Sequence, residues 1–279
     1  MTHWIRVNRE LFLVTGKAHY LDNIEFAFYN AFLAGVYRDG KWGAHSVRSH
    51  GTRHRTAPHQ VGMKYHHCCI DNMPRTFVDF ATTMLTRTSD GTLSVNLYSP
   101  GFARLKGDEV EIAGDYPVGN RVRVTVKKTK SGKIRFRRPK CFDAVRVDGA
   151  EQVGAWHEIM AEVGTKTYEL EFVRTPRLVV GTTSPNADPR ADAFEFASEN
   201  PEMKGLARAT PAFRLVYGPL LLAKSKRLGE DREDVLRALL SVDESCECEL
   251  VPFANTAVWG AWRAEIRQGG KSTSLEKVL

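Results

Sequence analysis

The densest group of chemically reactive side chains lies in the segment YHHCCIDN, residues 65–72. Cys68 and Cys69 are adjacent, and neighbouring Cα atoms stand about 3.8 Å apart, below the roughly 4.4–6.8 Å span of an ordinary disulfide. We therefore expect two free thiols. Thiolates beside imidazole groups suit zinc, and a helix start nearby favours the thiolate form. Free cysteine is also among the most buried residue types, so two small buried side chains in a loop remain an alternative.

The other three cysteines carry weaker signals. Cys246 and Cys248 would place both thiols on one face of a strand, but the sequence shows no third ligand and favours a structural role. Cys141 follows Pro139 without an evident partner. An odd number of cysteines, in a chain whose first residues lack the features of a signal peptide, argues against a disulfide framework. We expect a cytoplasmic protein.

A strongly basic run occupies residues 120–140, with ten Lys or Arg side chains and no Asp or Glu. Valines at every second position from Val122 to Val126 predict a strand with one buried and one charged face. Ser131-Gly132 predicts a hairpin turn into the next alternating run. Charges on a solvated or edge strand prevent edge-to-edge pairing, and polyanion binding is the less favoured alternative. Because this run lies in an otherwise acidic C-terminal part, we do not expect a general nucleic-acid-binding protein.

The first third of the chain, which would position these residues, has helical spacing. One helix is predicted over residues 4–13, stopped by a glycine, and a second over 20–34 that is apolar on most sides and therefore buried. A third is predicted from Pro74 to about Leu85, with Asn72 as its cap. Residues 36–67 form a long loop that holds six of the nine histidines.

After residue 91 the apolar period changes from that of a helix to that of a strand. Strands are predicted around residues 93–97, 110–112, 122–126, 134–136, 144–147, 168–172, 178–180, 213–217, 220–223, 246–250 and 262–266. Residues 184–212 form an irregular connection, and a short helix is predicted over 232–240. Many short strands separated by turn residues predict an antiparallel sandwich.

Eight short segments recur together in one enzyme family. They are LVTG (residues 13–16), YLD (20–22), IE (24–25), YNA (29–31), LAG (33–35), HCCIDNMPR (67–75), LSVNLY (93–98) and YGPL (217–220). With these segments the chain resembles the β-L-arabinofuranosidase-like glycoside hydrolases of family 127. The resemblance is strong over residues 1–127 and thins out to about residue 223.

The resemblance implies a multidomain α and β fold. C-terminal helices of an α/α barrel (residues 1–89) would precede an antiparallel β-sandwich (90–223) and an extension with a short helix and strands (224–279). It implies a retaining glycoside hydrolase that acts on a terminal arabinofuranoside or a related sugar. In that family the nucleophile is a cysteine thiolate held by zinc, which assigns Cys68 as nucleophile and zinc ligand and Cys69 as zinc ligand.

The resemblance also implies that this chain needs further residues for catalysis. The family's acid/base Glu and its two other zinc ligands, in a Glu-x-Cys motif, lie upstream of the first helix matched here. One interpretation is the C-terminal part of such an enzyme, inactive alone. A second is a non-catalytic remnant that binds carbohydrate or another protein. A third is a separate zinc protein in which histidines such as His66 and His67 substitute for the other ligands.

Composition limits the partners. The 279 residues are 42% apolar, enough for a core, and no apolar run reaches the roughly 18 residues of a membrane span. We expect a carbohydrate ligand and neither a membrane nor a nucleic-acid partner. Helices 4–13 and 20–34 would expose faces that other barrel helices cover, which predicts self-association or binding of an N-terminal half.

Overall fold

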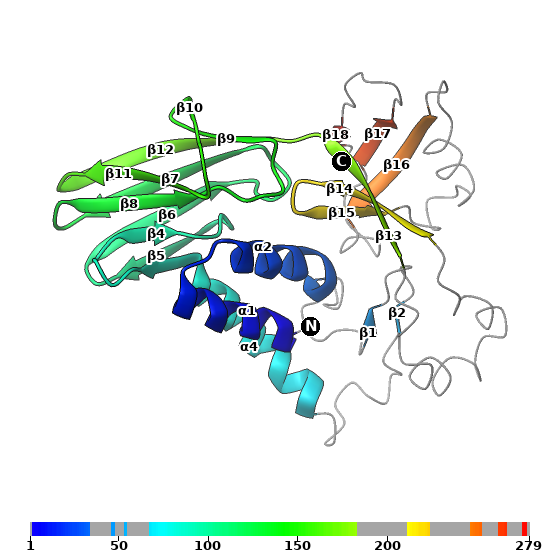
Figure 1. The fold of residues 1–279 in the computed structure, drawn as a ribbon, viewed down its shortest axis with the longest axis horizontal. Coiled ribbons are helices and arrows are strands. Elements are labelled where there is room, and N and C mark those ends of the chain that lie inside the picture. Colours follow the sequence, from blue (N-terminus) through cyan, green and yellow to red (C-terminus); the bar gives the residue numbers. More distant parts are fainter. Residues whose placement is uncertain are drawn as a thin grey trace.

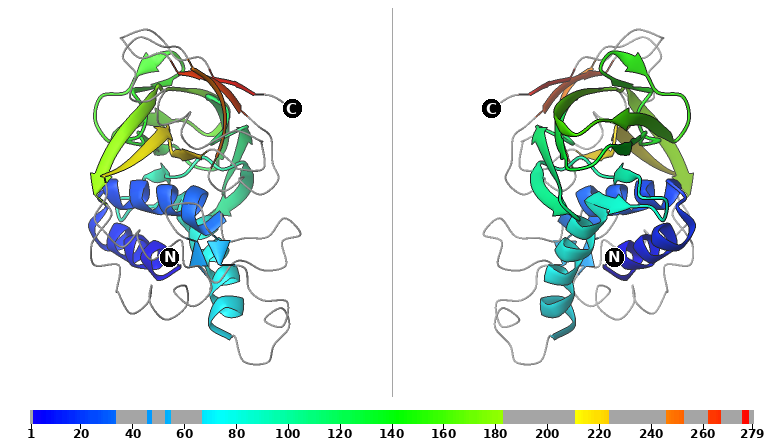
Figure 2. Two further views of the ribbon diagram at one scale, coloured as in Figure 1. Left: turned by 90° about the vertical axis from the view of Figure 1, so that its right-hand side faces the viewer. Right: turned by 90° about the vertical axis from the view of Figure 1, so that its left-hand side faces the viewer.

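The computed structural model describes residues 2–33, 46–47, 53–54, 67–182, 211–223, 246–252, 262–266 and 275–277. Its helices lie together on one side of the strands (Figure 1), and α4 projects away from them (Figure 2). They are α1 (Thr2–Thr15), α2 (His19–Phe26), the π-helical η1 (Ala27–Phe32) and α4 (His67–Met84). Within the described ranges, no helix has the length and apolar character needed to cross a membrane.

Helix α1 forms where the spacing predicts it. Ile5, Asn8 and Phe12 are its buried residues. Gly16 follows the helix with a φ of +69°, the left-handed conformation that glycine adopts most easily. Its N–H donates to the carbonyl of Phe12 at 2.7 Å, which closes the last turn. The first predicted helix and its glycine stop are confirmed.

The second predicted helix is continuous but changes its winding. Residues His19–Phe26 are α-helical and Ala27–Phe32 are π-helical, a change that the apolar pattern does not predict. Leu21, Ile24 and Phe28 are all buried. This burial confirms that a helix apolar on most sides lies between other elements.

Helix α4 begins at His67, and the predicted start near Pro74 is wrong. Asn72 therefore lies inside the helix and is not its cap. Proline has no N–H to donate and is common in the first turn, which is why the pattern places the start there. The helix nevertheless continues through Pro74, and tertiary packing stabilises its later turns. In that packing the ring of Phe80 stacks on that of Phe28, with centroids 3.7 Å apart.

Two of the sheets carry most of the strands before residue 174. The six-stranded sheet has the order β10-β9-β12-β7-β6-β5, and the four-stranded sheet has the order β11-β8-β4-β3. The six are β5 (Gly101–Leu105), β6 (Asp108–Gly114), β7 (Arg121–Lys128), β9 (Ala144–Val147), β10 (Ala150–Glu151) and β12 (Gly164–Val173). The four are β3 (Leu85–Arg87), β4 (Leu93–Val95), β8 (Gly132–Arg137) and β11 (Trp156–Ala161). The β4–β8 pair is parallel, and the other pairs in these two sheets are antiparallel.

These two sheets pack face to face. Val122, Val124 and Val126 of β7 are buried, and their neighbours along the strand alternate toward solvent up to Lys127. Phe136 of β8 and Tyr168 of β12 meet with ring centroids 5.1 Å apart. The predicted alternation of the basic run is confirmed, and its apolar face forms part of a core shared by both sheets.

The hairpin predicted across Ser131-Gly132 is wrong. Strand β7 pairs with β6 and β12, whereas β8 pairs with β4 and β11 in the opposite sheet. The chain therefore crosses between sheets at this turn. Each run has an apolar face, and packing the two faces against each other covers both, which pairing side by side would not do.

A third sheet follows the order β13-β14-β15-β16-β17-β18. Its strands are β13 (Pro176–Thr182), β14 (Pro211–Tyr217), β15 (Leu220–Ala223), β16 (Cys246–Pro252), β17 (Trp262–Ile266) and β18 (Leu275–Lys277). Two short strands, β1 (Ser46–Val47) and β2 (Arg53–His54), pair with each other. Most of the loop predicted over 36–67, most of the irregular connection over 184–212, and the helix predicted over 232–240 lie outside the described residues.

Candidate functional site

Cys68 and Cys69 are the second and third residues of α4, and His67 is the first. The prediction that placed the pair in a loop before the helix is therefore wrong. In the first turn the backbone N–H groups have no partner within the helix, and the positive end of the helix dipole favours a thiolate. His66 lies outside the described residues. The backbone thus gives both cysteines a setting that suits a nucleophile or a metal ligand.

An aromatic cluster holds α4 against the preceding helix. The ring of Phe77 packs edge-on against Phe28 and Phe32, with centroids 5.8 and 5.0 Å apart. Tyr29 packs edge-on against Phe80 at 5.9 Å. These contacts join the segment that carries Tyr-Asn-Ala to the helix that carries Cys-Cys. Two motifs of the family resemblance therefore meet in one packed unit.

A buried ionic cluster joins α2 to the sheets. The side chain of Arg137, at the end of β8, is 0% exposed. Its Nη1 lies 2.6 Å from Asp22 Oδ1, and its Nη2 lies 2.7 Å from Glu25 Oε2. Its Nε donates to the carbonyl of Asn96 at 2.5 Å. Burial lowers the pKa of Arg137, but Glu25 and Asp22 raise it by more, so the guanidinium stays charged.

Glu25 has no free oxygen for a substrate. Oε1 accepts a hydrogen bond from the Tyr116 hydroxyl at 2.6 Å, while Oε2 is occupied by Arg137. Burial raises the pKa of Glu25, an effect that the Arg137 charge opposes. A carboxyl with a raised pKa can serve a glycosidase as its acid, but this one is enclosed in the core. The cluster is therefore structural.

Asn30 connects the Tyr-Asn-Ala segment to the Gly-Pro-Leu segment. Its Nδ2 donates to the carbonyl of Pro219 at 2.8 Å, and its Oδ1 accepts from the N–H of Leu221 at 2.7 Å. Gly218 has a φ of +59°, and a Cβ there would lie 3.0 Å from the Phe142 ring. Only glycine fits that position without strain. The Tyr-Asn-Ala and Gly-Pro-Leu segments therefore hold the helices against the strands and shape the turn at Gly218.

No sequence pattern predicted the cluster around Arg137. Arg137 belongs to the basic run, in which the predicted charged face points to solvent. Asp22 and Glu25 carried the signal that could have revealed it. They stand three residues apart on one face of a helix predicted to be buried, and two buried carboxylates need a cation.

The outward basic residues of β7 are balanced by acidic neighbours in the same sheet. Arg121 Nη2 lies 3.8 Å from Glu171 Oε1, and Lys127 Nζ lies 3.4 Å from Glu109 Oε2. The strand register also places Arg123 opposite Glu169 of β12. Alternating charges across adjacent strands stabilise the sheet, so these three basic residues have a structural explanation.

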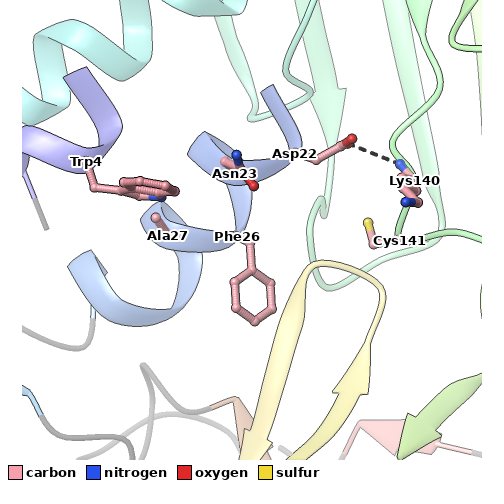
Figure 3. Close-up of a pocket in the computed structure, with 7 residues that line it drawn as sticks. All are labelled: Trp4, Asp22, Asn23, Phe26, Ala27, Lys140 and Cys141. Atoms are coloured by element: carbon pink, nitrogen blue, oxygen red, sulfur yellow. Dashed lines mark hydrogen bonds between the residues drawn. The ribbon is translucent and has the colours of Figure 1, made fainter. Parts of the chain in front are cut away.

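A groove lies between α2 and the loop that follows β8. Figure 3 shows its lining, which comes from α1, α2, the first residue of η1 and the loop after β8. The lining residues are Trp4, Asp22, Asn23, Phe26, Ala27, Lys140 and Cys141, around a volume of about 330 Å³. Asp22 Oδ1 accepts from the backbone N–H of Lys140 at 3.1 Å. Burial raises the pKa of the Cys141 thiol, which disfavours it as a nucleophile.

Metal-ligand geometry is not found in the described part of the chain. Over those residues, no three His, Cys, Asp or Glu side chains are grouped as metal ligands. The side chains of Cys68, Cys69 and His67 are not among those described. Their assignment as nucleophile and ligands therefore stays a prediction.

Comparison with known proteins gives similarity of fold. No family model matches the sequence, and no curated protein matches it. A GH127 β-L-arabinofuranosidase from Geobacillus stearothermophilus T6 has a TM-score of 0.52 at 15% identity over 99% of this chain. A glycoside hydrolase (TM-score 0.58, 18% identity, 96% of this chain) and a GH127 β-arabinofuranosidase (0.59, 15%, 98%) are also similar.

These matches cover 45%, 44% and 44% of the solved structures, so this chain spans a little under half of their length. The TM-scores of 0.52–0.59, at identities of 15–18%, show similarity of fold alone, and the arrangement of helices and antiparallel sheets agrees with it. The resemblance seen in the sequence motifs is confirmed at this level. The chain is similar in fold to part of these glycoside hydrolases.

Proposed function

We propose that this chain is the C-terminal part of a retaining glycoside hydrolase similar to the zinc-dependent β-L-arabinofuranosidases. In this proposal α1, α2 and α4 are the last helices of an α/α barrel, and the paired sheets form a β-sandwich module. The substrate is a terminal β-L-arabinofuranoside or a related sugar. The match of nearly the whole chain to three solved glycoside hydrolases is the observation that carries the proposal.

The donor atoms at the start of α4 fit zinc in kind. Two thiolates supply two of the four ligands that zinc commonly takes, and thiolate is a preferred donor. Cys68 and Cys69 would hold the ion, and its charge would keep the thiols deprotonated at neutral pH. The remaining ligands would come from His66 and His67 or from a second segment of an intact enzyme.

In the proposed reaction Cys68 is the nucleophile. Its thiolate attacks the anomeric carbon, a C–S bond forms, and the bond to the leaving oxygen breaks as a carboxylic acid donates a proton to that oxygen. Water, deprotonated by the same carboxylate, then displaces the thiolate and releases the sugar with retained configuration. That acid/base is not assigned in this chain, because Glu25 is enclosed and fully bonded.

Trapping of the glycosyl-cysteine tests the proposal. We would incubate the protein with 4-nitrophenyl β-L-arabinofuranoside, whose leaving group departs with little help from an acid, and quench the mixture in acid. Peptide mass spectrometry is expected to find an arabinosyl adduct on Cys68 that Cys68→Ser abolishes. Cys141→Ser is the matched control and is expected to leave the adduct unchanged.

An adduct on another cysteine, or none on a zinc-loaded protein, would contradict the assignment. The alternative is then a non-catalytic module that binds carbohydrate or a protein. Its support is the coverage of less than half of each enzyme that it resembles.

A further inference from the structure

Helix α4 is divided by Pro74 into two parts. Residues 67–73 lie before the proline and residues 75–84 follow it. In an α-helix each N–H bonds the carbonyl four residues earlier, and such bonds join the two parts. Proline has no N–H, and its ring crowds the carbonyl four residues before it, which here is that of Ile70. One of the hydrogen bonds that would join the two parts is therefore missing.

Thr76 bonds across the same turn. Its hydroxyl donates to the carbonyl of Asn72 at 2.9 Å, an acceptor that the backbone N–H of Thr76 normally uses in a helix. A threonine hydroxyl bonded to the carbonyl four residues earlier often bends a helix. Thr82 and Thr83 make the same kind of bond further along, but without a proline beside them. The turn at Pro74 thus combines a missing hydrogen bond with a bond that favours bending.

The part of α4 after the proline is anchored to the rest of the fold. Phe80 is 4% exposed, and its ring stacks on that of Phe28. Asn96, in the loop after β4, donates from Nδ2 to the carbonyl of Thr83 and from its backbone N–H to the carbonyl of Met84, both at 2.8 Å. Strand β3 begins at the next residue, so this end of the helix continues directly into a sheet.

The part before the proline has less support. Because α4 ends at a sheet, residues 67–73 lie at its far end, and Figure 2 shows that the helix projects away from the strands. A segment this short is well below the roughly 12–15 residues that an isolated helix needs in water. Its sequence begins with HCCIDN, residues that favour a helix less than alanine does. Its helical structure therefore depends on a connection that Pro74 weakens.

We propose that Pro74 is a hinge in α4, at which residues 67–73 lose and regain their helical hydrogen bonds while residues 75–84 stay folded. Cys68 and Cys69 lie on the hinged segment, so their position depends on what the thiols bind as well as on the fold. A zinc ion bound to both thiols would hold the segment in one position. That use of the hinge rests on the proposed function, whereas the hinge itself rests on the missing bond and on the anchoring of the later turns.

Amide hydrogen exchange of the whole chain, followed by mass spectrometry, tests the inference because it measures how often backbone hydrogen bonds open. In the wild type we expect the amides of residues 71–73 to exchange roughly a hundredfold faster than those of residues 80–83, relative to their intrinsic rates. Pro74 is exposed, so Pro74→Ala keeps the fold while it supplies the missing N–H. This variant should slow exchange at residues 71–73 roughly tenfold and leave residues 80–83 unchanged.

Val78→Ala is the matched control on the same helix. Val78 is 59% exposed, and alanine there favours the helix without adding an N–H. We expect it to change exchange at residues 71–73 by less than about twofold. Equal exchange of the two parts of α4 in the wild type would overturn the inference. So would a Pro74→Ala variant that slows exchange no more than Val78→Ala does.

Zinc added to the wild type separates this inference from the proposed function. With both correct, zinc slows exchange at residues 71–73 roughly tenfold, and the double variant Cys68→Ser, Cys69→Ser abolishes that effect. Fast exchange that zinc does not change would support the hinge and contradict the zinc site. Slow exchange in the wild type without zinc, together with a sugar adduct on Cys68, would overturn the hinge and support the function.

Discussion

The inner and outer faces of the helical layer differ in how fully their side chains are partnered. On the inner face Asp22, Glu25 and Asn30 each bond to residues of the strands. On the outer face Trp4 and Val14 are more than half exposed. The inner face therefore determines how the helices sit on the sheets, and the outer face is available to further protein.

This difference separates two kinds of motif. Residues of the Tyr-Asn-Ala and Gly-Pro-Leu segments join the helices to the strands, because the Asn30 side chain donates a hydrogen bond to the Pro219 carbonyl. Cys68 and Cys69 lie at the start of α4, far in sequence from both of those segments. A chain can keep the first kind for its fold whether or not the second kind still reacts.

Removing the Arg137 guanidinium, the cation that joins α2 to β8, is expected to lower the free energy of unfolding the most. Arg137→Met leaves Glu25 and Asp22 close together without their cation, and loss of one partner of a buried ion pair costs about 3–5 kcal/mol. Urea unfolding would measure this loss. Arg123→Met, on the solvent side of β7, is the matched control and is expected to change stability by less than about 0.5 kcal/mol. An equal loss of unfolding free energy in both variants would contradict a special role for the buried Arg137.

Asn30→Ala is expected to have the next largest effect. It leaves the Pro219 carbonyl and the Leu221 N–H without their partner, at a cost of about 2–3 kcal/mol in unfolding free energy. Asn23→Ala is the control on the same helix, because its amide makes one bond to Asn8 and is expected to cost about 1 kcal/mol. Thermal unfolding would rank the two variants, and a larger loss for Asn23 would disprove the role of Asn30.

The pH dependence of stability is expected to report a second buried cluster, around Asp108. Burial raises the pKa of this carboxyl, but hydrogen bonds from Lys128 and Arg87 outweigh that effect and lower the pKa from 3.8 to about 2. Its contribution is present above pH 3.8 and is lost as the pH falls toward 2, which amounts to about 2 kcal/mol. Asp108→Asn is expected to flatten this part of the curve, and an unchanged slope would contradict the assignment.

The smallest effect is expected at Val14, on the outer face of the helical layer. Val14 is 84% exposed, so Val14→Glu should change the unfolding free energy by less than about 0.5 kcal/mol. Differential scanning fluorimetry of the purified chain would measure it. A loss comparable to that of Asn30→Ala would mean that Val14 already packs within the chain, and would remove the contrast between the two faces.

Local patterns predicted most elements, because alternation and turn residues determine where a strand can lie. Ala144–Val147, Leu220–Ala223 and Trp262–Ile266 have the predicted bounds. The false hairpin at Ser131-Gly132 shows the limit, since a turn signal does not say which sheet the next strand joins. Pro74 shows another limit, because α4 runs through this residue although proline favours the first turn of a helix.

The candidate site was predicted less completely than the fold. Arg137 lies 115 residues from Asp22 and 112 from Glu25, and no local pattern links positions so far apart. The resemblance pointed to Cys68 and Cys69, and the helix start gives them a suitable backbone setting. Their chemistry stays a prediction that only a direct measurement can test.

That measurement is the zinc content of the purified chain. We would compare the wild type with the double variant Cys68→Ser, Cys69→Ser after zinc loading and dialysis, with Cys246→Ser, Cys248→Ser as the matched control. The account predicts about one zinc ion per chain in the wild type and the control, and its loss from the first double variant. Equal zinc content in all three proteins, or no zinc in the wild type, would contradict it.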